Sequence, residues 1–304
     1  MTKNKYCNPK AKNKKIGCFD LNQLKKMTKY TDISVKNKSA KELYEERLNY
    51  LQSTSEIDNY LKTIKAKGFK FLGTSANDWN YEIVPDFCIN DVLCKLDLKS
   101  LLSKGITRIA AVFNLDNHTR GGSHWVCVLS DLNEGGIYFI CSYGSKPKKE
   151  VLELVNKITN MGNVILLDNN HKLNNLHKTV INKFSKTGNS SIKIIKSNKG
   201  LYRPIQKDNL VYGYTRDGNL DYLGKVESVN GNSVKMSFNI PNNITHFEIS
   251  GFKYFYNTRH IQKGSNLCGV YCMFFIDCFA NGYSFPKLME MELDNDMLMH
   301  YLKG

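Results

Sequence analysis

The sequence predicts an α+β protein built on a central sheet with an antiparallel centre. Short apolar strands and amphipathic helices alternate irregularly along its 304 residues, whereas a wholly parallel sheet needs a regular β-α order. Two apolar stretches, His124–Leu129 and Ile137–Ser142, flank the turn signal Asp131–Gly136 and predict a hairpin at the centre of the sheet. A longer apolar run, Val270–Phe279, predicts a buried helix.

Residues 1–74 are predicted to form a basic, helical N-terminal region. Asp20–Met27 has the apolar spacing of a short helix. Ser39 and Glu42 have the spacing of a capping box, in which each side chain binds the backbone N–H of the other residue, so a second helix should begin there. A third helix is expected at Ser55–Ala66, where a glycine follows closely.

The first part of the core is predicted to span residues 75–183. It should open with a strand and a helix within Trp79–Leu96 and continue with a buried strand at Ile106–Phe113. After the central hairpin, we expect a helix at Lys149–Met161 and a strand at Val164–Leu167.

Residues 184–248 are more than this core needs, and they predict an inserted β lobe, either a small barrel or a sheet. The expected strands are Leu210–Tyr214, Tyr222–Val229 and Ser233–Phe238, which are separated by Asn-Gly and Asp-Gly hairpin signals. The lobe would either stabilise the core or dock a substrate or scaffold partner. The second part of the core then spans residues 249–304.

The segment from Gln262 to Gly269 combines the parts that a thiolate nucleophile needs. Cys268 directly precedes the predicted helix, whose positive dipole end favours the thiolate over the thiol. Gly269 would leave room for a substrate backbone. Gln262 closes a predicted strand, Phe252–Gln262, from which its amide N–H could reach an oxyanion.

His124-Trp125, far upstream, would supply the base. The chain order His, Gln, Cys is the reverse of papain's, which excludes a papain-like protein. Together, His124-Trp125, Gln262 and, six residues later, Cys268-Gly269 resemble the adenain-like cysteine peptidases, which include the SUMO-specific proteases and the adenovirus protease. The stretch 112–125 is most similar to the virion-maturation proteases of large DNA viruses.

That resemblance implies the adenain-like fold, with the nucleophile at a helix N-terminus, and a cysteine endopeptidase with no cofactor and no metal. Cys268 would be the nucleophile, His124 the general base and acid, and Gln262 the oxyanion donor, with Trp125 and Gly269 at the substrate. The implied cleavage follows small residues, of Gly-Gly or Ala-Gly type. The implied role is the processing of viral structural polyproteins at host-cytoplasmic assembly sites and in the virion.

One position departs from the family pattern. Position 17 after His124 is Cys141, where the family usually has Asp, Glu or Asn, and the predicted hairpin places Cys141 or Tyr143 opposite His124. A neutral thiol is a weak acceptor and cannot stabilise an imidazolium as a carboxylate does. Either Cys141 orients His124 weakly, or Ser142 or another group takes the role, or the enzyme is slow or inactive. We favour an active enzyme.

Three other functions use the same residues. A protease that removes SUMO or ubiquitin-like proteins has identical chemistry but needs a broad docking surface. An acetyltransferase on the same fold would carry an acyl group on Cys268, although Gln262 argues modestly against it. A non-catalytic scaffold is kept open by Cys141.

Composition and charge further limit the class of protein that this sequence can encode. The net charge of +15, much of it on N-terminal lysines, predicts either a solvated basic surface or salt-sensitive, sequence-independent attraction to DNA. Nine cysteines without a C-x-x-C pair predict neither a disulfide framework nor a zinc site. The absence of an apolar N-terminal leader and of any run of 18 apolar residues predicts no signal-peptide secretion and no membrane span.

Overall fold

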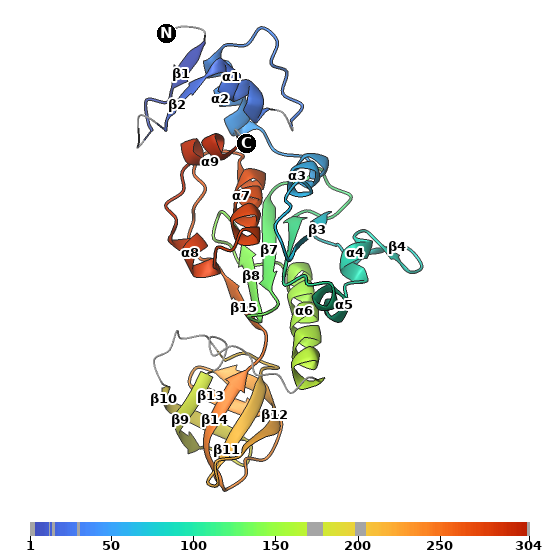
Figure 1. The fold of residues 1–304 in the computed structure, drawn as a ribbon, viewed down its shortest axis with the longest axis vertical. Helices are drawn as coiled ribbons and strands as arrows, with labels where there is room; N and C mark the ends of the chain where they lie inside the picture. Colours follow the sequence, from blue (N-terminus) through green and yellow to red (C-terminus); the bar gives the residue numbers. More distant parts are fainter. Residues whose placement is uncertain are drawn as a thin grey trace.

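The computed structural model describes residues 4–11, 13, 16–28, 31–168, 179–197 and 205–302. Its central feature is a five-stranded mixed sheet in which β7 and β8 pair antiparallel. In spatial order the strands are β15 (Lys253–Tyr256), β8 (Gly136–Ile140), β7 (Trp125–Asp131), β6 (Arg108–Asn114) and β3 (Phe69–Ser75). Helices pack on both faces, and the α+β class predicted from the sequence is confirmed (Figure 1).

Alternating residues along the strands divide the interior into two apolar layers, because successive side chains of a strand point to opposite faces. On one face, Val112, Cys127 and Leu129 pack against α7 (Cys268–Ala280). On the other face, Ala111, Val126 and Val128 pack with α6 (Lys149–Asp168). The first layer is completed by α8 (Phe285–Glu290) and α9 (Asn295–Tyr301), and the second by α4 (Asp91–Cys94) and α5 (Leu98–Ser103).

The register of the β7–β8 hairpin decides which residues meet at its open end. Cys127 pairs with Ile140, and Asp131 pairs with Gly136 beside the turn. Continuing this antiparallel register beyond the last paired residues brings His124 opposite Tyr143. The hairpin predicted from the sequence is therefore present in the structure.

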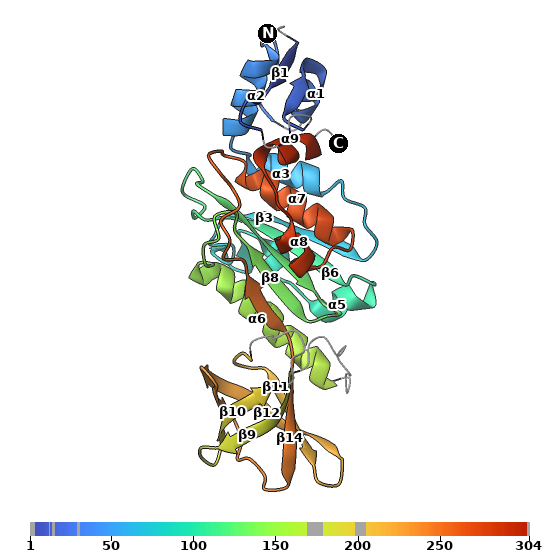
Figure 2. The same ribbon diagram turned by 90° about the vertical axis from the view of Figure 1, so that its left-hand side faces the viewer.

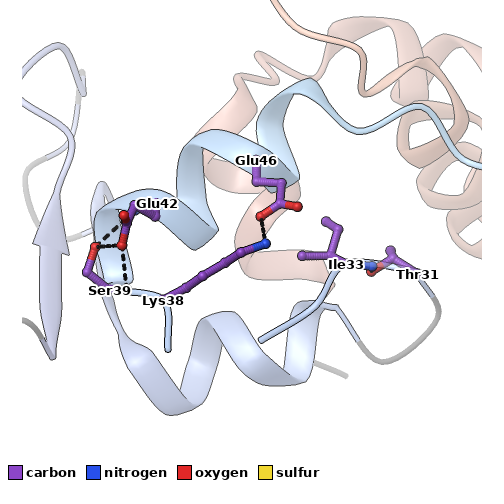
Figure 3. A network of polar contacts seen from close by, with 6 residues as sticks. All are labelled: Thr31, Ile33, Lys38, Ser39, Glu42 and Glu46. Atoms are coloured by element: carbon purple, nitrogen blue, oxygen red, sulfur yellow. Dashed lines mark hydrogen bonds and ion pairs between the residues drawn. The ribbon is translucent and has the colours of Figure 1, made fainter. Parts of the chain in front are cut away.

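An N-terminal lobe lies at one end of the molecule, next to α9 (Figures 1 and 2). It contains β1 (Lys5–Cys7), β2 (Cys18–Asp20), α1 (Leu21–Met27) and α2 (Ala40–Asn49), and the chain then continues into α3 (Thr54–Leu61), which packs on α7 and β3. Each helix begins with a capping box, and the predicted pair Ser39–Glu42 is one of them. Figure 3 shows this pair together with the Lys38–Glu46 ion pair, which joins the chain before α2 to the next-to-last turn of the helix.

A closed β-barrel occupies the opposite end of the molecule (Figures 1 and 2). Its strands follow the order β10 (Ser191–Ser197), β13 (Ser233–Met236), β12 (Leu220–Asn230), β11 (Leu210–Thr215), β14 (Ile244–Ser250) and β9 (Thr179–Lys186). It has its own apolar core, with Val211, Val226 and Phe247 fully buried. The predicted insertion, 184–248, falls within these bounds.

Two predicted strands are wrong. Val164–Leu167 forms the last turn of α6, because a short apolar run suits a buried helix as well as a buried strand. The strand expected at Phe252–Gln262 ends at Tyr256. There the Asn257 side chain takes over the pairing with β8: its Oδ1 accepts from the Cys141 N–H at 2.8 Å, and its Nδ2 donates to the Cys141 carbonyl at 2.8 Å.

The expectation of no disulfides is also wrong. Cys7 and Cys18 face each other across β1 and β2 and are bonded, and a second disulfide joins Cys88 to Cys94. The second one links β5 (Phe87–Cys88), which pairs with β4 (Glu82–Val84), to α4. Neither spacing matches a C-x-x-C motif, so only the fold reveals these pairs. Within the described residues, no helix is both long and apolar enough to cross a membrane.

Candidate active site

Cys268 is the first residue of α7, as the sequence predicts, and only 2% of it is exposed. The backbone N–H of Trp125 points at its sulfur, with 3.5 Å between N and Sγ. Burial raises the pKa of the Cys268 thiol, although backbone N–H groups of Trp125, Gly269 and Cys268 itself act in the opposite direction. The N–H groups at the helix terminus thus favour the thiolate, as the sequence predicts, but desolvation outweighs them.

His124 lies immediately before β7 and is also buried. Its Nε2 lies 3.4 Å from the Sγ of Cys141, while Nδ1 makes no hydrogen bond to any described residue. The Tyr143 ring stacks on the imidazole, with 4.4 Å between ring centroids and an interplanar angle of 11°. Burial lowers the pKa of His124 to about 4, so the imidazole is neutral at pH 7 and is able to accept a proton.

Gln262 is fully buried in the irregular segment between β15 and α7. Its backbone N–H donates to the Ser142 carbonyl at 3.0 Å, and its Oε1 accepts from the Ser142 hydroxyl at 2.6 Å. Its Nε2 donates to the Ser265 carbonyl at 2.5 Å and, more weakly, to the Tyr143 hydroxyl at 3.3 Å. The amide is thus held in one orientation, with its N–H groups directed away from Ser142.

Trp125 and Gly269 both contact Gln52, from the N-terminal lobe. The Trp125 indole N–H donates to the Gln52 carbonyl at 2.8 Å. A Cβ on Gly269 would lie 2.7 Å from Gln52 Oε1, so the glycine is required for this close packing. Sequence reasoning missed Gln52, because nothing near it in the chain resembles a site.

The structure thus brings Cys268, His124, Gln262 and Cys141 together in one buried constellation. No family model matches the chain. A protein of Acanthamoeba polyphaga mimivirus, R355, provisionally named a thiol protease, is 34% identical over 92 residues, which are 29% of this chain and 28% of that protein. The chain resembles the adenain-like cysteine peptidases.

Two solved structures overlap with this chain at low identity. The ASFV pS273R protease is 12% identical with a TM-score of 0.44, over 83% of this chain and 66% of that one. The SUMO protease Ulp1 is 10% identical with a TM-score of 0.38, over 98% of both chains. The adenain-like resemblance is carried here by the site residues and their order along the chain.

Trp125, the residue after His124, is one of the residues that line a cavity of about 470 Å³. Gly121, Gly122, Gln52 and Ser75 are also among the residues that line it. Three buried polar atoms at the cavity have no hydrogen-bond partner among the described residues, namely Gln52 Oε1, Thr74 Oγ1 and Ser75 Oγ. Buried polar groups are normally paired, so these three atoms are exceptions within the described part of the chain.

The remaining candidate residues are also placed. His118, one of the cavity-lining residues, is bonded to Asp78 with 2.7 Å between Nδ1 and Oδ2. His260 contacts the Tyr143 ring edge-on, at 5.2 Å between centroids. No group of three or more His, Cys, Asp or Glu residues in the described part of the chain could hold a metal ion.

Proposed function

We propose that this protein is a cysteine endopeptidase in which Cys268 attacks the scissile carbonyl. The observation that carries the proposal is the 3.5 Å contact between the Trp125 N–H and the Cys268 sulfur. This contact seats the thiol beside the backbone of the residue that follows His124. This supports a nucleophile and a base that act together, although they are 144 positions apart in the sequence.

The resting pair is a neutral thiol and a neutral imidazole, because burial raises the pKa of Cys268 and lowers that of His124. Proton transfer from Cys268 to Nδ1 of His124 would accompany formation of the S–C bond. The oxyanion would be stabilised by the Cys268 backbone N–H and by Gln262 Nε2, which first has to exchange its weak contact with Tyr143 for the oxyanion. His124 then donates the proton to the leaving amine as the C–N bond breaks, and water hydrolyses the thioester.

The substrate we propose is an extended polypeptide with small residues before the cut, of Gly-Gly or Ala-Gly type. The support comes from the cavity beside Trp125, which is lined by small and polar residues that include Gly121, Gly122 and Ser75. A lining of this kind leaves room for small side chains and offers little apolar surface to large ones. Processing of viral structural polyproteins, in the host cytoplasm and the virion, is the biological role we propose on the basis of the family resemblance.

One panel of reactions tests this function. Wild type and Cys268→Ala would be incubated with a Gly-Gly-X peptide, a ubiquitin-like electrophilic probe and acetyl-CoA. We expect Cys268-dependent cleavage of the peptide alone. Labelling by the ubiquitin-like probe would instead indicate a deconjugating protease, and acetyl transfer would indicate an acetyltransferase. If Cys268 supports none of these reactions, the proposed activity is wrong.

A further inference from the structure

Three consecutive residues after β8, Cys141 to Tyr143, contact separate parts of the candidate active site. We call them the 141–143 segment. Cys141 lies at His124 Nε2, and Ser142 bonds both the backbone and the side chain of Gln262. Tyr143 contacts His124 through its ring and Gln262 through its hydroxyl.

The ring of Tyr143 has two restraints on its position. Its flat face lies nearly parallel to the His124 imidazole, at 4.4 Å between centroids, and its edge meets His260 at 5.2 Å and 72°. The residue is 42% exposed, so it forms an outer cover over an imidazole that is itself buried. A ring held in this way limits rotation of His124 about its Cβ–Cγ bond.

The thiol of Cys141 cannot supply what a carboxylate would supply at the same place. It offers Nε2 a weak, neutral acceptor, and it cannot stabilise the positive charge that His124 acquires when it takes the proton of Cys268. The negative face of an aromatic ring does attract a cation that lies over it. Tyr143 presents that face to His124.

We propose that Tyr143 is the positioning residue for His124 and carries the task that a carboxylate at position 141 would perform. Its ring holds the imidazole plane and stabilises the transient imidazolium, and its hydroxyl places Gln262 Nε2 beside the same centre. This inference rests on the proposed function, in which His124 is the base. The role of Tyr143 explains how His124 can act as a base with a cysteine at position 141.

A matched set of variants separates the ring from the hydroxyl. Tyr143→Phe keeps the ring face and should lower kcat by only about threefold, since it loses one weak hydrogen bond. Tyr143→Leu removes the ring, and a misplaced base should lower kcat by about 100-fold with little change in KM. Tyr283→Leu removes another partly exposed tyrosine, 37% exposed and outside the site, and serves as the control for folding.

The decisive measurement combines Tyr143→Leu with Cys141→Asp. If the ring replaces a carboxylate, the loss caused by Tyr143→Leu should shrink from about 100-fold to about tenfold or less in the Cys141→Asp background, because residues that share one task are not additive. Equal losses in both backgrounds would overturn the inference. So would a Tyr143→Phe variant as impaired as Tyr143→Leu.

A second readout does not depend on peptide cleavage. The rate at which iodoacetamide alkylates Cys268, located by mass spectrometry, reports whether His124 can take the thiol proton. The alkylation rate should fall in Tyr143→Leu and in His124→Ala, and it should stay close to the wild-type rate in Tyr143→Phe. If wild type cleaves no peptide, the proposed function is wrong. The alkylation rate would still test whether Tyr143 positions His124. Equal alkylation of wild type and Tyr143→Leu would overturn the inference.

Discussion

His124 and Cys141 lie 3.4 Å apart, from Nε2 to Sγ, at the open end of the β7–β8 hairpin. The contact puts a neutral thiol where the adenain-like pattern usually has an acidic or amide side chain. It occupies Nε2, so in the proposed mechanism Nδ1 is the nitrogen that accepts the proton of Cys268. The register of the β7–β8 hairpin brings Cys141 to His124, whatever side chain stands at position 141.

Replacing this thiol with a carboxylate should make the enzyme faster. A hydrogen bond to a charged group exceeds a neutral one by about 1 kcal/mol, so Cys141→Asp should raise kcat about fivefold. Cys141→Ser, which is neutral and of similar size, is the matched control and should not reproduce the gain. Steady-state kinetics on a Gly-Gly-X peptide measures the effect. An unchanged or lower rate in Cys141→Asp would mean that the carboxylate gives His124 no further support.

Gln262 should act on the transition state. Removing its amide in Gln262→Ala should lower kcat by about 100-fold and leave KM almost unchanged, because an oxyanion donor is used only in the transition state. Ser142→Ala keeps the amide but removes the 2.6 Å bond to Oε1, so it should cost about tenfold or less. A Gln262→Ala variant that changes KM alone would assign Gln262 to substrate binding.

Burial of His124 predicts a stability that depends on pH. Its pKa falls from 6.5 to about 4 on folding, so between these values the unfolded chain binds a proton that the folded protein does not. Stability is therefore complete above pH 6.5 and declines as the pH falls toward 4, by about 3 kcal/mol in all. Denaturant unfolding at pH 7 and pH 4.5 measures the change.

The control for this pH effect is His124→Gln, which cannot titrate and should lose less stability between the two pH values. If wild type and His124→Gln lose the same amount, other groups cause the acid sensitivity.

Gly269 should not tolerate a side chain. In Gly269→Ala the new Cβ would lie 2.7 Å from Gln52 Oε1 and 3.1 Å from Gln52 Cβ, and both residues are buried. Overpacking of this kind costs about 1 to 3 kcal/mol, measurable as a lower Tm. Gln52→Ala in the same molecule should recover part of the loss, because it removes Oε1, the nearer of the two atoms, and keeps only Cβ. No recovery in the double variant would show that Gly269 is needed for a different reason.

Much of the candidate site could be predicted from sequence because its members belong to local patterns. The helix after Cys268 follows from an uninterrupted apolar run, and the approach of Cys141 to His124 follows from strand register. The errors arose where a local pattern suits two structures, as at Val164–Leu167, or where one side chain ends a strand, as Asn257 does.

The sequence by itself determined the order of the functional residues, the α+β class and the central hairpin, which left Cys141 or Tyr143 opposite His124. These follow from periodicity and chain order, which act over a few residues. Only the tertiary structure decided the burial that raises the pKa of Cys268, the contact of Gln52 with Gly269 and the stacking of Tyr143 on His124. Each depends on segments remote in the chain that pack together and exclude water, and no local pattern encodes such packing.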